Sequence, residues 1–197
     1  MISIVALNGG KYKKYLPEFL SSIQPQLGNH ELIVDPWFPD QHHADMINHV
    51  IAKARGEWIL QVGTDDKLCP GALDALEKSI EPGFDVFYGN LKFFEGSDDV
   101  CLANQNITLE DFRENNQVYI SSLFSKHAWK TVGGFWGDDN FAEDWDFWMR
   151  LMKAGFKFKY IDKIILEYRV HQDQAWNTMC EHFEEMKELI NKRMDLI

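Results

Sequence analysis

Two adjacent aspartates, Asp65 and Asp66, are the residues whose type and placement point most clearly to chemistry. They follow the apolar run 57–62 and precede a turn at Pro70, so a strand is expected to end at them. Neighbouring carboxylates repel each other and need water, hydrogen-bond donors or a cation to compensate. Ligands of open parallel sheets bind at the carboxyl ends of strands, and a hard cation that bridges a diphosphate uses carboxylate oxygens. The pair therefore points toward an enzyme that handles a nucleotide diphosphate.

Two further charged clusters stand beside predicted structural breaks. Glu143 and Asp144, with Asp146, open a predicted amphipathic helix, while Arg169 and His171 follow a predicted strand. Acids also favour the positive amino end of a helix, so capping and chemistry both remain open for the first cluster. We expect Asp146 to be a first-turn or surface charge. In the second cluster, a structural role remains open for both residues.

Hydrophobic periodicity predicts an α/β fold, because three strand–helix units precede residue 82 and imply a parallel sheet with right-handed crossovers. A hairpin is expected within 88–103. The predicted strands are 2–7, 31–35, 57–62, 84–88, 119–124 and 156–166. The predicted helices are 14–23, 44–54, 71–80, 108–114, 126–132, 144–154 and 178–194.

Composition narrows the function classes. The 197 residues suit one domain, and the formal charge of −11 without a basic stripe argues against a nucleic-acid partner. Three scattered cysteines, Cys69, Cys101 and Cys180, suit free thiols in a reducing cytosol. The start of the chain reads as a strand and not as a leader peptide, and no apolar run is long enough for an integral membrane segment. We therefore expect a cytoplasmic protein.

The order of these pieces resembles family 2 glycosyltransferases of the GT-A fold. The resemblance spans most of the chain, and its fragments are Asn8, 31–35, 54–59, 64–68 with Pro70 and Leu73, 133–135, Glu143-Asp144 with Arg150-Leu151 and Gly155, and 168–171. It implies a single domain over 1–197. About 1–90 would be the nucleotide-binding half, and about 91–197 the acceptor-side half with a C-terminal helix.

The resemblance also implies a donor site that needs Mn²⁺ or Mg²⁺. Asp66 would bind the metal, and Asp65 would share it or contact the ribose. His171 would reach the diphosphate or the outer sphere of the metal. The remaining residues expected at the nucleotide are Asn8, Asp35 and Arg55.

For the reaction, the resemblance implies that Asp144 is the general base toward an acceptor hydroxyl and that Glu143 orients it or the acceptor. A carboxylate positioned as a general base accelerates such a step by roughly 10²–10⁴-fold. Since no carboxylate nucleophile is evident, we expect inversion at the sugar. The expected enzyme is a hexosyltransferase of polysaccharide biosynthesis, with a UDP-sugar favoured as donor and a saccharide or lipid-linked saccharide as acceptor. The oligomeric state stays open.

Some segments depart from the family pattern or allow other interpretations. Where the family has an acidic turn with glycine and serine, this chain has 35–40, in which Trp37 or Phe38 could stack on a base or pack on the first helix. Trp136 and Trp176 could be sugar platforms or core residues. Three residues share one helical face and could mimic a zinc site, although the pattern lacks a fourth ligand: His42, Asp45 and His49.

Two other function classes fit parts of the pattern. A nucleotidyltransferase would use a similar acidic metal site, but it needs a glycine-rich basic loop, of which residues 8–11 are a faint version. A catalytically degenerate, carbohydrate-binding protein of the same fold would lose its acids. The presence of Asp65, Asp66 and Asp144 argues against that class.

Overall fold

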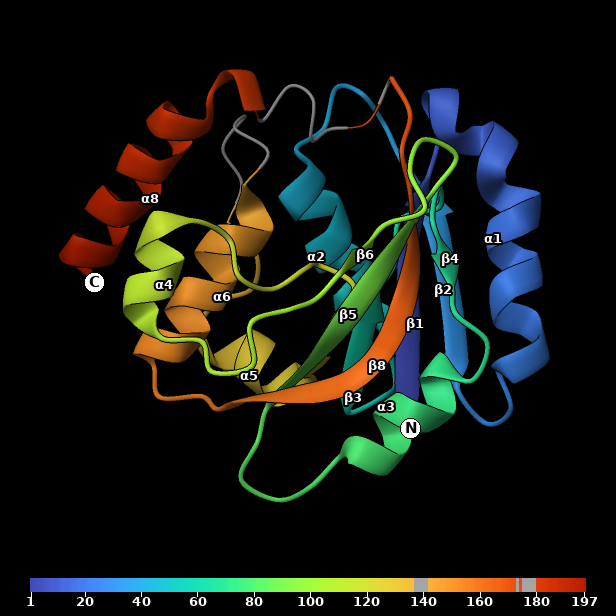
Figure 1. Cartoon of the computed structure of the whole chain (residues 1–197), viewed down its shortest axis with the longest axis horizontal. Helices are drawn as coiled ribbons and strands as arrows, with labels where there is room; N and C mark the ends of the chain where they lie inside the picture. The colour runs from blue at the N-terminus through green and yellow to red at the C-terminus, as the bar shows by residue number, and fades with distance from the viewer. Residues whose placement is uncertain (137–141, 173, 175–179) are drawn as a thin grey trace.

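The apolar runs of the sequence pair into one mixed sheet. The computed structural model describes residues 1–136, 142–172, 174 and 180–197 (Figure 1). In the described residues the strands are β1 (Ile2–Asn8), β2 (Glu31–Pro36), β3 (Trp58–Gln61), β4 (Lys67–Leu68), β5 (Val86–Phe94), β6 (Val100–Cys101), β7 (Leu123–Ser125) and β8 (Phe158–Arg169). Their spatial order is β2-β1-β3-β7-β5-β8-β4, and β6 pairs with β5.

The strand directions confirm a mainly parallel sheet with a smaller antiparallel part. β1 runs parallel to β2 and β3, and β5 runs parallel to β8. β7 is antiparallel to both β3 and β5, and the short strands β4 and β6 are antiparallel to β8 and β5. The carboxyl ends of β1, β2, β3, β5 and β8 therefore share one edge of the sheet.

Helices cover both faces of the sheet. They are α1 (Leu16–Ile23), α2 (His43–Lys53), α3 (Ala72–Ser79), α4 (Leu109–Glu114), α5 (Lys126–Thr131), α6 (Glu143–Lys153) and α8 (Phe183–Leu196), with short 3-10 turns at Gly10–Tyr15 and Gln24–Gln26. Side chains alternate along a strand. In β1, Val5 packs with α2, α5 and α6, whereas Ile4 and Ala6 pack with α1 and α3. Figure 1 shows α1 and α6 on opposite sides of the sheet.

Most predicted elements are confirmed within a few residues, and the predicted strand 119–124 is the clearest difference. Only Leu123–Ser125 pairs in the sheet. Residues 119–122 are irregular, and just before them the Asn116 side chain accepts from the backbone N–H of Val118 and donates to Asp144. The predicted start of the last helix, at residue 178, lies outside the described residues.

Asp146 lies in the first turn of α6, as one of the two expectations had it, but it is not a surface charge. Its side chain is 1% exposed, and its Oδ2 accepts from Arg150 Nε over 2.7 Å within the same helix. Arg150 also donates to the carbonyl oxygen of Val132. A buried ion pair therefore fixes α6 against the chain that precedes it.

Candidate active site

The two aspartates lie in a tight turn after β3. The backbone N–H of Asp66 donates to the carbonyl oxygen of Gly63 over 3.1 Å. A Cβ at Gly63 would lie 2.8 Å from Asp65 Oδ1 and 3.1 Å from Asp66 Oδ2. Both carboxylates thus fold back over the same Cα, and a side chain at position 63 would displace them.

Asp66 is the more buried acid of the pair, with 7% of its surface exposed. Its Oδ1 accepts from the backbone N–H of Arg169 over 2.9 Å. Burial and the charge of Asp65 nevertheless raise the pKa of Asp66 well above its usual value. Two ionised carboxylates in this turn are therefore unfavourable on their own, and a bound cation would offset that cost.

His171 joins this pair. Its Nε2 lies 3.1 Å from Asp65 Oδ2, and its ring lies against the rings of Tyr12 and Tyr15. The structure thus brings together the three residues expected at the metal and diphosphate. They come from segments more than 100 residues apart, because β8 ends beside the turn that follows β3.

The residues fit a divalent cation that phosphates share. Within the described residues, no three His, Cys, Asp or Glu side chains are grouped as a closed metal centre. Asp65 and Asp66 still supply two carboxylates whose oxygens converge beside Gly63. Mg²⁺ is usually held by one or two carboxylates together with substrate phosphates, and Mn²⁺ prefers similar oxygen ligands.

Asp144 and Glu143 occupy the first turn of α6. Asp144 accepts from Trp145 N over 2.8 Å and from Asn116 Nδ2 over 2.9 Å. Burial and the charge of Glu143 outweigh these donors and raise the pKa of Asp144 to about 7. A carboxylate with that pKa can both take up and release a proton near neutral pH.

Glu143 has a partner on another helix. Its Oε1 lies 2.7 Å from Nδ1 of His43, at the start of α2. Burial opposes ionisation of Glu143, but the contact and charge of His43 lower its pKa. For the imidazole, burial acts in the opposite sense, and Glu143 together with Asp144 raises the pKa of His43. The two side chains thus form an ion pair next to Asp144.

Tyr168 of β8 is influenced by the charges of both groups of acids. Its side chain is half-buried and packs edge-on against Phe93. Burial, followed by the charges of Asp66, Asp65 and Asp144, raises the pKa of its phenol. The phenol therefore lies within electrostatic range of the turn after β3 and of the first turn of α6.

The other expected donor residues separate into two places. Asn8 ends β1, and its Oδ1 lies 3.5 Å from the hydroxyl of Thr64 in the aspartate turn. Asp35 lies at the same edge, where its Oδ2 is 2.6 Å from Lys53 Nζ. Arg55 does not join them, because its Nε binds Glu31 over 2.7 Å at the amino end of β2. We leave Arg55 out of the candidate site.

The aromatic and histidine alternatives also have definite positions. Trp37 covers the turn after β1. A Cβ at Gly9 would lie 2.5 Å from the main-chain carbonyl oxygen of Trp37. Phe38 is 46% exposed. Trp136 lies over the guanidinium of Arg150 at 4.2 Å. Trp176 is outside the described residues, and the described residues form no zinc centre at the start of α2.

Sequence reasoning gave no role to Asn116, His43 or Tyr168. Asn116 and His43 reach the first turn of α6 from far along the chain, at 28 residues and 100 residues respectively. Tyr168 belongs to the segment 168–171 that carries part of the family resemblance. An aromatic residue at a strand end was the one signal that could have pointed to a role for Tyr168. The other two follow no local pattern.

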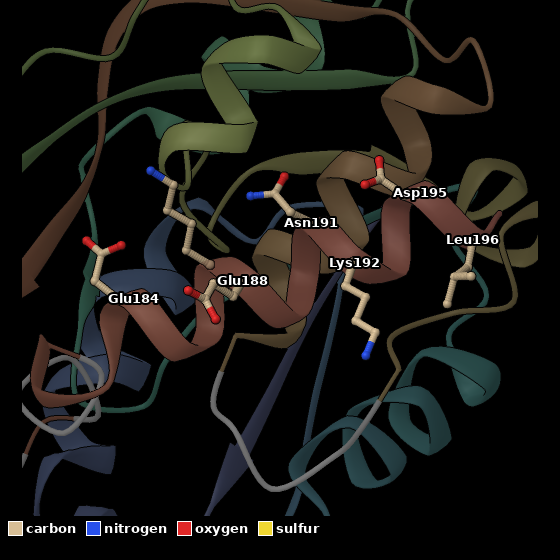
Figure 2. Close-up of a pocket in the computed structure, with 7 residues that line it drawn as sticks. Glu184, Glu188, Asn191, Lys192, Asp195 and Leu196 are labelled. Atoms are coloured by element: carbon tan, nitrogen blue, oxygen red, sulfur yellow. The ribbon is translucent and has the colours of Figure 1, made fainter.

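A separate surface hollow runs along α8. Figure 2 shows its side chains projecting from that single helix, and its lining contains none of the acids described above. The residues that line it are Glu184, Lys187, Glu188, Asn191, Lys192, Asp195 and Leu196. We therefore place the candidate site at the sheet edge and not in this hollow.

No protein-family model and no curated protein matches the sequence. Solved structures do match. S. aureus TarS 1-349 in complex with UDP-GlcNAc has a TM-score of 0.67 at 17% identity, over 90% of this chain and 60% of that chain. The mannosyltransferase PcManGT from Pyrobaculum calidifontis, with GDP-Man and Mn²⁺, has a TM-score of 0.64 at 12% identity, over 89% of this chain and 59% of that chain.

A third structure, a Drosophila beta-1,4-galactosyltransferase 7 mutant with manganese, UDP-Gal and xylobiose, has a TM-score of 0.57 at 14% identity, over 90% of this chain and 73% of that chain. The chain thus spans about 60% of the length of the first two of these neighbours. None of the helices in the described residues is long and apolar enough to span a bilayer. The arrangement of strands and helices is the GT-A fold of nucleotide-sugar glycosyltransferases.

Proposed function

We propose that this chain transfers a sugar from a nucleoside diphosphate donor to an acceptor hydroxyl. The observation that carries the proposal is the convergence of Asp65, Asp66 and His171 at the carboxyl edge of the sheet. A paired acid site and a separate, half-buried base on α6 suit a reaction with two ends, a leaving diphosphate and an attacking hydroxyl. The fold and the carboxyl edge of the sheet support the same assignment.

On the donor side, Asp66 and Asp65 would hold Mn²⁺ or Mg²⁺, which supplies charge stabilisation for the departing nucleoside diphosphate. His171 fixes Asp65 and faces the same space. Asn8 and Asp35 line the edge where a base and ribose would lie. The net charge of −11 repels an anionic donor, and a bound cation would reverse the local sign.

On the acceptor side, Asp144 takes the proton of the attacking hydroxyl, and Asn116 holds its Oδ2 in place. Glu143 raises the pKa of this base while His43 holds Glu143. A single displacement with one base inverts the anomeric centre. We propose a hexose donor, with UDP favoured as the nucleotide, because UDP-sugars occupy two of the neighbours described above and GDP-Man the third.

The proposed acceptor is a saccharide or lipid-linked saccharide, which places the chain in polysaccharide biosynthesis. All three cysteines are free thiols. Free thiols suit a reducing compartment, and on that ground we propose a cytoplasmic location.

The test is a panel of nucleoside diphosphates and nucleotide sugars, each with and without Mn²⁺, read by thermal shift. A donor at 100 times its Kd stabilises the fold by about 2.7 kcal/mol. We expect a shift that needs Mn²⁺ for one nucleotide class, and no such shift with any member would contradict the proposal. Release of nucleoside diphosphate, and not of pyrophosphate, separates it from a nucleotidyltransferase.

The same panel identifies the donor for a rate measurement. Asp144→Asn should lower the rate of nucleoside diphosphate release by roughly 10²–10⁴-fold while Mn²⁺-dependent binding persists. Asp74→Asn is the matched control, because Asp74 lies exposed on α3 and pairs with Lys78. A folded Asp144→Asn variant with nearly normal turnover would exclude Asp144 as the base.

A further inference from the structure

Arg169, which ends β8, is packed tightly beside the aspartate turn. Its backbone N–H donates to Asp66 Oδ1 over 2.9 Å, and its Nε donates to the main-chain carbonyl oxygen of Asp65 over 2.7 Å. The rings of Tyr15 and Phe94 each lie 4.4 Å from its Cζ. With 2% of its side chain exposed, the guanidinium has little freedom to reorient.

The ion pairs of Arg169 are with other acids. Its two terminal nitrogens bind Glu18 of α1 and Glu95, which follows β5. Its hydrogen bonds to the aspartate turn use a backbone N–H and a backbone carbonyl oxygen, so they fix the turn without joining the guanidinium to either aspartate side chain. The guanidinium consequently leaves the side-chain oxygens of Asp65 and Asp66 available to a cation.

Glu95 binds Arg169 from an unusual backbone conformation. Glu95 has φ of +63°, the left-handed region, and among the described residues it is the one non-glycine with positive φ. The next residue is just as constrained, because a Cβ at Gly96 would lie 2.6 Å from Val170 Cγ1. Val170 N also donates to the carbonyl oxygen of Phe94 over 2.9 Å. Such strained conformations persist where the surroundings over-determine them, and they concentrate at functional sites.

From these contacts we infer that Arg169 is a positioning residue. It sets the geometry of Asp65 and Asp66 for the metal and diphosphate, while Glu18 and Glu95 bind the two terminal nitrogens of its guanidinium. The inference rests on the proposed function and adds to it a clamp that joins α1, the β5–β6 hairpin and β8 at the donor site. The planar fork of arginine is needed for it, because the ammonium of lysine is a point charge that cannot bind three separated acceptors in one plane.

The experiment measures the metal-dependent gain, which is the Kd for UDP without Mn²⁺ divided by the Kd for UDP with Mn²⁺, and repeats it with GDP. In Arg169→Lys we expect this gain to fall by about 10- to 100-fold, the usual effect of removing a group that orients a metal ligand. The Kd for nucleotide without metal should change little. Arg113→Lys is the matched control, because Arg113 also joins two elements by ion pairing with Asp195, on α4 and α8.

A second pair of variants covers the case in which Arg169→Lys does not fold. Glu95 is 51% exposed, so Glu95→Gln should fold; it leaves the guanidinium one carboxylate partner fewer and frees it to compete with Mn²⁺. Glu167→Gln removes the same charge from a residue that pairs with Lys67 on the neighbouring strand. We expect the gain to fall in Glu95→Gln and to stay near wild type in Glu167→Gln.

The possible results distinguish a failure of the proposed function from a failure of the role inferred for Arg169. A wild-type chain with no metal-dependent gain for UDP or GDP overturns the proposed function together with this inference. A normal wild-type gain that Arg169→Lys retains overturns the inference alone. Equal losses in Glu95→Gln and Glu167→Gln would overturn it as well, because net charge would then explain the effect.

Discussion

Single residues decide the proton chemistry of the candidate site. Asp144 keeps a pKa of about 7 even though it accepts two hydrogen bonds, since burial and the charge of Glu143 outweigh those donors. The ionised form of Asp144 is the base, so the rate should rise with pH through a midpoint near that value. This makes the electrostatic surroundings of one carboxylate measurable in a pH profile.

Glu143→Gln should move this midpoint to lower pH. The substitution removes a negative charge that raises the pKa of Asp144, so the base ionises more easily. His43→Gln is the contrasting variant, because it leaves the Glu143 charge without its partner and should not lower the midpoint. The readout is the initial rate of nucleoside diphosphate release between pH 5 and pH 9. A midpoint that rises in Glu143→Gln would contradict the assigned source of the shift.

Between elements, α2 is joined through Asn48 to α5 and to the chain that follows α5. Asn48 of α2 donates to the carbonyl oxygen of Phe135 and accepts from both Phe135 N and Trp129 Nε1, all within 2.9 Å. A Cβ at Gly134, which has φ of +76°, would lie 2.6 Å from Asn48 Oδ1. One amide thus explains why a glycine precedes Phe135.

Asn48→Ala should therefore destabilise the fold. Three partly buried hydrogen bonds are lost, and we expect the free energy of unfolding to fall by roughly 2–4 kcal/mol. Asn106→Ala is the control, because that side chain is exposed on a loop. Urea denaturation measures the change. A loss in Asn48→Ala no larger than in the control would show that the contact contributes little.

These examples show what the sequence could and could not predict. Local periodicity located the elements, and the acids Asp66 and Asp144 stood out because each lies at an element boundary. The partners Asn116, His43 and Asn48 remained hidden, since side-chain pairs across 28 to 100 residues leave no spacing to detect. The partner of Asp146 was visible in the sequence. Arg150 follows it by four residues, which is the spacing of an ion pair on one helix face.

For the whole molecule, the charge of −11 bears on how a donor approaches. A nucleoside diphosphate without metal is repelled, and salt screens that repulsion. We expect the Kd for metal-free UDP to fall as NaCl rises from 20 to about 150 mM, where the screening length is about 8 Å. The Kd with Mn²⁺ should change less. Isothermal titration at both salt concentrations tests this, and metal-free binding that weakens with salt would contradict it.

The place of β8 within the sheet has a consequence for biosynthesis. β8 lies between β5 and β4, and it carries Tyr168 and Arg169 to a turn formed about 100 residues earlier. During translation the aspartate turn therefore leaves the ribosome long before its partners exist. Until then the two aspartates lack the contacts that Arg169 and His171 make with them. The nascent chain can form these contacts only after residue 171 has emerged.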